Sequence, residues 1–266
     1  MLLSNRNKIN AVKFLKIPLL LVWRVWFYIL MIACILLFFP FLFIFSFKEE
    51  QYHLFWNFAR ILSKTLIYGM GFRLSFNSDQ CIDPSKSYIY CLNHASFLDP
   101  FVLIALSKKP IVFVGKKELS KIPVFGFLYR RTVIMVDRGS FISRKRVFEI
   151  AKKRLQNGVS MAIFPEGLVP TEEVVLAPFK RGAFSLAIEF QIPIIPQVYY
   201  DCKRFFSWDL LKGRPGTLRV HQHKFIETKG MSVKQDMDAL KNKTFNILYD
   251  DLVNDKRYMK DTTRKK

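Results

Sequence analysis

The stretch SYIYCLNHASFLDPFVLIALS (87–107) sets the pattern of this 266-residue chain. Its first six residues, SYIYCL, form an apolar run that is typical of a buried strand. Its last nine, DPFVLIALS, indicate a helix that starts near Pro100, because proline suits the first turn of a helix. The polar segment NHASFL separates the two. A strand, a short loop and a helix in this order predict one unit of an α/β fold.

The alternation of strand and helix continues on both sides of this stretch. We expect helices at 140–158, with Ser140 or Ser143 as the N-cap and Gly158 as the stop, and at 182–191. The residues between 115 and 133 indicate a loop or a short helix. The further expected strands are RLSFN (73–77), IVFVG (111–115), VIMVD (133–137), VSMAIFP (159–165) and IPIIPQVYY (192–200). This order predicts an α/β fold with a mainly parallel sheet flanked by helices.

The N-terminal region carries a membrane-anchoring segment in this interpretation. Residues 25–47 contain no charged side chain, and such a helix is long enough to cross a hydrocarbon core of about 30 Å. Basic residues before it and acidic residues after it would hold the N-terminus in the cytoplasm. A single crossing would then place the rest of the chain outside. Pro40 offers an alternative, in which two half-length helices enter and leave through the same leaflet.

A cleaved signal peptide is a third possibility, but the apolar run is longer than a signal core and no small-residue cleavage site follows it. We therefore predict a retained anchor and leave its topology open. A helix at 53–71, ending with Gly71 as its C-cap, would link the anchor to the remainder. The expected domains are residues 1–71, the anchor and linking helix, and residues 72–266, the main domain. The basic end of the chain, 256–266, indicates a frayed tail.

The charge of the chain points to an anionic partner. It contains 42 Lys and Arg against 21 Asp and Glu, for a net charge of +21, while 51% of its residues are hydrophobic. Such a chain suits a nucleic acid or an anionic membrane surface. The apolar segment favours the membrane, and no nucleic-acid-binding motif accompanies the charge. The helix with RKRVFEIAKKR (144–154) has a basic face that would either bind an anionic partner, the membrane surface or acyl carrier protein, or simply face water.

His94 and Asp99 lie in the polar break of the opening stretch. In a straight helix, residues five apart are rotated by about 140°, so the two side chains can meet only if a tight turn separates them. Asp99 could instead, or in addition, act as the N-cap of the following helix. His94 could be a structural histidine satisfied by its neighbours. If the carboxylate holds the Nδ1 proton, Nε2 becomes a base that can deprotonate an alcohol near pH 7.

Ser96 offers a nucleophile for a Ser, His, Asp arrangement, but the chain has no G-x-S-x-G elbow. We therefore favour a histidine that activates the acceptor directly. Two other polar clusters, DR (137–138) and PEG (165–167), also follow expected strands. Ligands of such folds bind beyond the carboxyl ends of the strands, so the three clusters predict one active site.

The sequence gives no indication of a metal site. The four cysteines form no C-x-x-C pattern and are expected to be buried free thiols. His221 and His223 share one face of a strand, but no third ligand accompanies them. We therefore expect no metal.

Four blocks of sequence resemble the glycerophospholipid acyltransferase family and, within it, the bacterial 1-acyl-sn-glycerol-3-phosphate (lysophosphatidic acid) acyltransferases. The resemblance runs from Asn93 to Tyr199, in the order that the family has. The blocks are NHASFLDP (93–100), VGKKELSKIPVFGFLYRRTVIMVDR (114–138), FPEG (164–167) and IPIIPQVY (192–199). Any one of them would be weak evidence, whereas the ordered set is specific.

The resemblance implies a site and a reaction. His94 and Asp99 would be the catalytic pair, Lys116 and Arg138 would bind the substrate phosphate, and Glu166 with Gly167 would bind the acceptor. The enzyme would transfer a fatty acyl group from a thioester to the free 2-hydroxyl of 1-acyl-glycerol-3-phosphate, which gives phosphatidic acid. It would need no metal or other cofactor. The donor would be acyl-coenzyme A or acyl-acyl carrier protein, and the enzyme would work at the cytoplasmic face of the inner membrane.

The chain departs from the family after the third block. Many relatives continue with Thr, Arg and Ser, whereas this chain has Leu168, Val169 and Pro170. The acceptor could therefore be a different lyso-lipid, such as lyso-ornithine lipid or one with a larger head group. Lys180 or Arg181 could restore the missing charge or be ordinary surface cations. A non-catalytic, basic, membrane-binding protein of the same fold is the alternative from another functional class.

Overall fold

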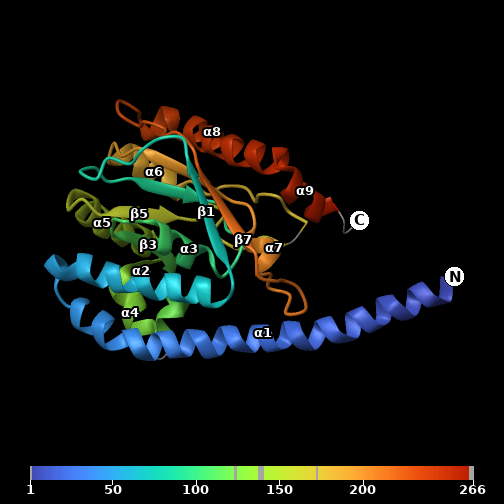
Figure 1. The fold of residues 1–266 in the computed structure, drawn as a ribbon. Helices are drawn as coiled ribbons and strands as arrows, with labels where there is room; N and C mark the ends of the chain where they lie inside the picture. Colours follow the sequence, from blue (N-terminus) through green and yellow to red (C-terminus); the bar gives the residue numbers. More distant parts are fainter. Residues whose placement is uncertain (1, 123–124, 137–140, 172, 264–266) are drawn as a thin grey trace.

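The central sheet of the chain lies between two layers of helices (Figure 1). The computed structural model describes residues 2–122, 125–136, 141–171 and 173–263, with the backbone alone at 2–15, 141–146 and 261–263. Helices α2 (Tyr52–Gly69) and α3 (Asp99–Leu106) cover one face of the sheet. The other face is covered by α5 (Phe141–Gln156), α6 (Gly182–Glu189) and α8 (Val233–Asn254).

Within the described residues the sheet has seven strands in the order β1-β7-β6-β2-β5-β3-β4. Neighbouring strands are parallel, except for the antiparallel pair of β6 and β7. The mainly parallel α/β fold is therefore confirmed. The strands are β1 (Arg73–Ser78), β2 (Ile89–Leu92), β3 (Ile111–Lys116), β4 (Val133–Val136), β5 (Ser160–Ile163), β6 (Ile194–Tyr199) and β7 (Thr217–Gln222).

Strand β2 shows why these residues hold the two layers together. Alternate side chains of a strand point to opposite faces. Tyr90 and Leu92 accordingly enter the core beneath α2 and α3, while Ile89 and Cys91 enter the core beneath α5, α6 and α8. Because both faces are covered, the strand reads as a continuous apolar run.

The remaining elements are short, apart from α1. They are α1 (Leu2–Phe45), η1 (Glu49–Gln51), η2 (Lys117–Lys121), α4 (Phe125–Thr132), α7 (Cys202–Phe205) and α9 (Lys256–Thr263). The frayed tail predicted for 256–266 is wrong for its first part, because α9 is helical and Tyr258 is buried against the core. The expectation that all four cysteines are buried is wrong for Cys81, which is exposed.

Helix α1 is continuous, so the alternative of two half-length helices separated at Pro40 is not found. Pro40 lies inside the helix, and the buried side chains of Cys34 and Leu42 on either side of it pack with α2. This packing keeps the two halves of the helix in line despite the missing N–H. The chain instead turns after Phe45, and α2 returns along α1 (Figure 1).

Gly71 ends α2 as predicted. Its φ of +76° is a left-handed conformation, which favours glycine. The Gly71 N–H donates to the Tyr68 carbonyl and the Phe72 N–H donates to the Ile67 carbonyl. These two bonds form a Schellman motif, which turns the chain directly into β1. The predicted division of the chain into domains at residue 71 stays a prediction.

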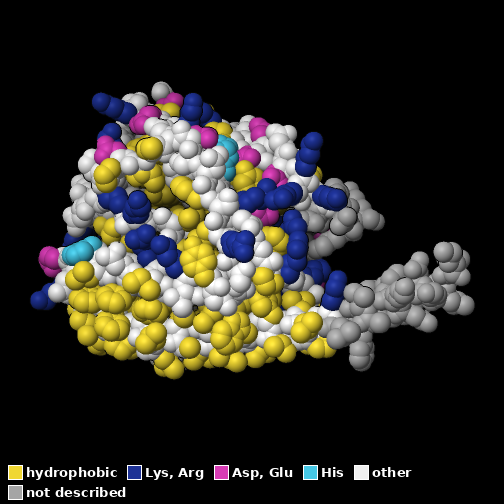
Figure 2. Space-filling model, in the orientation of Figure 1, with side chains coloured by type: hydrophobic (Ala, Val, Ile, Leu, Met, Phe, Trp, Pro, Cys, Tyr) yellow, Lys and Arg dark blue, Asp and Glu magenta, His cyan; other side chains and the backbone are white. Residues whose placement is uncertain are grey.

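The outer surface of α1 is an apolar band. Among the described residues, Lys16–Phe45 is the one helical segment long and apolar enough to cross a membrane, judged by length and composition. Hydrophobic side chains cover the lower face in Figure 2, with Lys and Arg spread over the surface above it. Side chains such as Leu19, Val22 and Leu36 are about two-thirds exposed. Stacking of Phe43 on Phe127 extends the band to α4.

Arg24 links α1 to the loop 206–212 by hydrogen bonds. Its side chain is buried, and Nη2 donates to the carbonyl oxygens of Ser207, Asp209 and Lys212. The guanidinium also lies over the ring of Phe206, 4.3 Å from its centroid. A buried charge needs such partners. The inner side of α1 is therefore matched to the loop 206–212, while its outer side is apolar.

Candidate active site

His94 and Asp99 meet at the carboxyl end of β2. His94 Nδ1 lies 2.9 Å from Asp99 Oδ2. The same oxygen accepts the backbone N–H groups of Ala95 at 2.6 Å and Ser96 at 2.8 Å. Because a carboxylate only accepts, the ring proton is on Nδ1, and Nε2 is left as the basic nitrogen. The Asp99 side chain is fully buried, whereas that of His94 is 22% exposed.

The chain between the two residues is a turn, as the pairing requires. Asp99 is the first residue of α3, and Leu98 occupies the N-cap position. The alternative of Asp99 as the N-cap is therefore wrong. Its carboxylate points back to the N–H groups that precede it and not forward into the helix. The buried charge at the start of α3 also interacts favourably with the helix dipole.

Ser96 has a structural position. Its hydroxyl is buried and donates to the Phe206 carbonyl oxygen at 2.7 Å. It also accepts the Leu98 N–H at 3.3 Å. A nucleophile needs a hydrogen bond to the base and access to the substrate. The position of Ser96 therefore favours direct activation of the acceptor by His94 over an acyl-serine.

A ring stacking and a pair of amide hydrogen bonds orient the loop. The His94 ring stacks on Phe164 with centroids 4.2 Å apart. Asn93 bonds the end of β6 twice, since its Nδ2 donates to the Tyr199 carbonyl at 3.0 Å and its Oδ1 accepts the Tyr199 N–H at 2.7 Å. These contacts fix the position from which His94 extends.

Glu166, after β5, is buried directly behind His94. One carboxylate oxygen accepts the His94 N–H at 2.6 Å and the other accepts the Ala177 N–H at 2.7 Å. Burial raises the pKa of Glu166 to about 7, although these two hydrogen bonds act in the opposite direction. Both oxygens face the protein backbone, so this geometry holds the loop in place. The predicted contact of Glu166 with the acceptor stays a prediction.

Gly167 lets a cation approach the site. Its φ is +74°, and a methyl group added at its Cα would lie 2.9 Å from Lys180 Nζ. Of the two cations considered as replacements for the missing charge, Lys180 is thus the one beside the third block. Arg181 points elsewhere, since it pairs with Asp238 of α8 at 2.8 Å.

A cavity of about 460 Å³ lies beside the loop that carries His94. Ala95, the neighbour of His94, forms part of its wall, as do Val169 and Pro170 from the altered third block. Lys203 contributes a cation, whose Nζ donates to the carbonyl oxygens of Thr171 and Val174. The remaining lining residues are Thr171, Glu173, Ser207, Trp208, Asp209 and Lys212. The segment that departs from the family pattern therefore shapes the space next to His94.

The structure describes one of the two predicted phosphate ligands. Lys116 is the exposed last residue of β3. Arg138, together with Asp137, lies outside the described residues. Of the three clusters expected to meet, NHASFLD and PEG are brought together by the neighbouring strands β2 and β5.

The comparisons with known proteins agree with this arrangement. Residues 73–200 match the family model described as Acyltransferase. Residues 73–200 belong to the acyltransferase family. The His94–Asp99 pair, Glu166 and Gly167 all lie within this acyltransferase domain.

Several known proteins are similar in sequence to part of this chain. It is 32% identical over 142 residues to a 1-acyl-sn-glycerol-3-phosphate acyltransferase of Cocos nucifera, with 53% of this chain and 46% of that protein covered. It is 33% identical over 117 residues to the Helicobacter pylori protein of that name, with 44% and 49% covered. The human beta protein is 27% identical over 175 residues, with 65% and 62% covered. The matches thus span less than two thirds of these relatives.

A solved structure extends the likeness to the fold. The crystal structure of the 1-acyl-sn-glycerophosphate acyltransferase from Thermotoga maritima matches with a TM-score of 0.72 and 19% identity. The match covers 89% of this chain and 95% of that one. The architecture around the acyltransferase domain is therefore shared as well.

Several residues of the acyltransferase domain and its surroundings were not predicted from the sequence. Phe164 stacks on His94, and its place in FPEG was the available signal. Lys203 and Trp208 line the cavity from DCKRFFSW, a segment without a recognised motif. Their contribution depends on how the chain folds back after β6, which local sequence does not reveal.

Proposed function

We propose that this chain is a membrane-bound acyltransferase that transfers a fatty acyl group to the 2-hydroxyl of 1-acyl-glycerol-3-phosphate and forms phosphatidic acid. The single observation that carries the proposal is the His94–Asp99 pair, with Nδ1 held by a buried carboxylate and the ring partly exposed beside a cavity. The names of the relatives support this choice of acceptor.

The proposed reaction uses one base. His94 Nε2 takes the proton of the acceptor hydroxyl while the oxygen attacks the carbonyl carbon of an acyl thioester. The tetrahedral intermediate collapses, the C–S bond breaks, and the thiolate takes the proton from the imidazolium. Asp99 stabilises the positive charge that forms on the ring. No cofactor is needed, and acyl-coenzyme A or acyl carrier protein serves as the donor.

The apolar band supports a lipid acceptor that arrives from a membrane. Phe97, three residues after His94, is 42% exposed, and its ring lies 6.0 Å from that of Phe27 in α1. The exposed Trp208 at the cavity lies 6.5 Å from Phe97. An apolar surface thus runs from α1 to the catalytic loop. We place this surface in the cytoplasmic face of the cell membrane, where the basic side chains above it meet anionic lipids.

An acceptor comparison tests the proposal. Purified full-length protein in anionic-lipid micelles is given labelled acyl-coenzyme A with lysophosphatidic acid or with monoacylglycerol, which lacks the phosphate. We expect acylation of the phosphate-bearing acceptor alone, and a KM for it that rises at least tenfold in Arg138→Ala and in Lys116→Ala. The matched control is Lys86→Ala, a surface cation paired with Asp83. Equal rates with both acceptors would contradict the proposed phosphate contacts.

The residues that follow the third block favour a second candidate acceptor. Val169 and Pro170 line the cavity at positions where the family resemblance leads us to expect Arg and Ser. A lyso-lipid with a larger head group, such as lyso-ornithine lipid, is therefore the alternative acceptor. Val169→Arg separates the two. If the alternative holds, this variant loses transfer to lyso-ornithine lipid and gains transfer to lysophosphatidic acid.

A further inference from the structure

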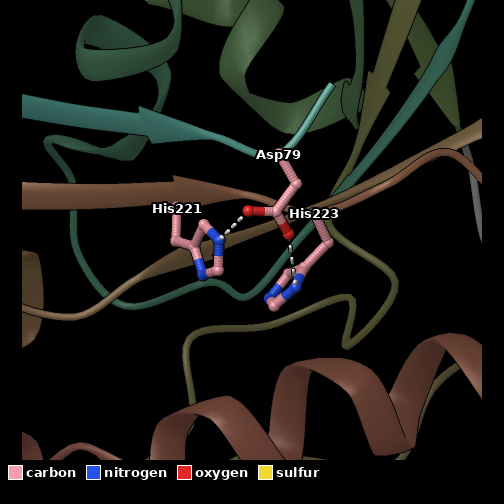
Figure 3. A group of neighbouring side chains, drawn as sticks. All are labelled: Asp79, His221 and His223. Atoms are coloured by element: carbon pink, nitrogen blue, oxygen red, sulfur yellow. Dashed lines mark hydrogen bonds and ion pairs between the residues drawn. The ribbon is translucent and has the colours of Figure 1, made fainter.

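A second group of histidines and carboxylates lies on the side of the sheet that faces α8 (Figure 3). His221 is on β7 and His223 follows it, while Asp79 follows β1. The sequence shows no third ligand for the histidine pair, and the structure adds the carboxylate of Asp79 beside it. Strands β1 and β7 run parallel with Ser78 opposite Gln222, and this register brings Asp79 to both rings although 142 residues separate it from His221.

The three side chains converge on one point. His221 Nε2 lies 3.0 Å from Asp79 Oδ1, and His223 Nδ1 lies 3.8 Å from Asp79 Oδ2. One ligand atom from each residue lies within 4.8 Å of the other two. The two imidazole rings are neighbours, with centroids 4.1 Å apart. All three side chains are partly exposed, so an ion can reach them from solvent.

Asp251 of α8 orients the rings from behind. Its Oδ2 lies 2.7 Å from His221 Nδ1, where it accepts the ring proton. The same oxygen lies 2.7 Å from His223 Nε2 as an ion-pair contact. Tyr200 fixes this carboxylate, because its hydroxyl donates to Asp251 Oδ1 at 2.7 Å. In the neutral ring with its proton on Nδ1 toward Asp251, His221 Nε2 presents a lone pair to Asp79. His223 Nδ1 lies on the same side of the cluster, facing the other oxygen of Asp79.

Two neutral imidazole nitrogens and a carboxylate at these distances provide three ligand atoms for one cation. Zinc ligands at bonds of about 2.1 Å in tetrahedral geometry are roughly 3.4 Å apart, and the spacings of 3.0 and 3.8 Å lie on either side of this value. Imidazole nitrogen favours a transition metal over Mg²⁺ or Ca²⁺. A carboxylate that holds the second nitrogen of a ligating histidine is the usual support of such sites.

We propose that Asp79, His221 and His223 bind a divalent transition metal ion of the zinc type, with Asp251 and Tyr200 as the supporting shell. The site is separate from the acyl-transfer site, because β6 lies between β7 and β2 and none of the three ligands lines the cavity beside Ala95. The ion joins the ends of β1 and β7 and, through Asp251, α8. Its role is to stabilise this edge of the sheet.

The test measures zinc binding by the full-length protein. The protein is purified in detergent, stripped with a chelator, dialysed and titrated with Zn²⁺ by calorimetry, and its melting temperature is recorded with and without the ion. We expect one zinc per chain, a Tm that rises by several degrees, and visible absorption bands of tetrahedral Co²⁺ when cobalt replaces zinc. Asp79→Asn keeps the size of the side chain and weakens binding at least tenfold.

Controls distinguish the site from other zinc binding. His53→Ala removes an exposed histidine whose ring contacts the Glu50 carbonyl, and it keeps the full affinity. His223→Ala loses binding and the Tm response together. Wild-type protein that binds no zinc, or that binds it as tightly as Asp79→Asn does, overturns the proposal. In that case protons alone hold the two histidines between their carboxylates.

Discussion

The chain places histidine beside aspartate twice, and the two clusters differ in what the second ring nitrogen meets. In the catalytic loop, Asp99 holds Nδ1 of His94, and the ring is partly open beside a cavity. At β7, both ring nitrogens of His221 face carboxylates, Asp251 on one side and Asp79 on the other. A base needs one free nitrogen, whereas a metal ligand needs a lone pair directed at the ion that it shares with other ligands. The same residue types therefore indicate different chemistry.

Replacing the histidines should give the largest difference between the two clusters in what the variants lose. His94→Ala should lower kcat for acyl transfer by about 10³-fold, within the range that general-base catalysis supplies. His221→Ala should instead lower the Tm and zinc affinity. Steady-state transfer to lysophosphatidic acid measures the first effect, with His53→Ala as the unaffected control. A His94→Ala variant with the wild-type rate would remove His94 as the base.

Replacing the supporting carboxylates should have the next largest effect. Asp99→Asn presents an amide that can donate to Nδ1 and place the ring proton on Nε2, the wrong tautomer for a base. We expect kcat to fall about 10²-fold, with KM little changed. Steady-state kinetics give kcat and KM of the variant, and circular dichroism verifies that it is folded. A change in KM alone would mean that Asp99 binds substrate and does not orient His94.

Glu166 gives the active-site cluster a dependence on pH. Its pKa is raised from 4.5 to about 7 in the folded protein, so the folded state holds this proton more tightly than the unfolded state. The resulting stabilisation is present below pH 4.5 and is lost as the pH rises to about 7. Its full size is about 3 kcal/mol.

Glu166→Gln should remove this contribution, because the amide does not titrate. Thermal unfolding at several values between pH 4.5 and 7.5 compares the slopes for the wild type and the variant. The wild type should lose more stability over this range than Glu166→Gln does. Parallel curves would show that Glu166 titrates normally and is not desolvated in solution.

The hydroxyl beside each histidine should have the smallest effect on the chemistry. Ser96 donates to the Phe206 carbonyl much as Tyr200 donates to Asp251. Ser96→Ala should cost about 1–2 kcal/mol of stability through the lost buried hydrogen bond and keep kcat within about threefold. Loss of activity equal to that of His94→Ala, with the fold intact, would restore Ser96 as a nucleophile.

Local patterns predicted the sheet and the contact between His94 and Asp99. The apolar run of β2 and the glycine that ends α2 depend on neighbouring residues only, and both were confirmed. His94 and Asp99 are five residues apart, so a single turn decides whether they meet. FPEG was also predicted to lie beside this pair, because both segments follow expected strands. The parallel pairing of β2 with β5 confirms this.

Contacts between residues far apart in the sequence were not predicted, because they depend on tertiary packing. Asp79 and Asp251 reach the histidine pair only through the pairing of β1 with β7 and the packing of α8. Arg24 looks like a charge that flanks the anchor, yet it is buried against the loop 206–212. Pro40 reads as a helix break, but packing against α2 keeps α1 continuous. In each case tertiary packing decides the outcome.

In the proposed mechanism, His94 activates the acceptor directly, without an acyl-enzyme. Mass spectrometry of the purified protein with acyl-coenzyme A tests it, first alone and then with lysophosphatidic acid. Without the acceptor, the mass of the protein should stay unchanged. With it, phosphatidic acid and free coenzyme A should form in equal amounts. An acyl group bound to the protein, or the absence of product, would contradict the account.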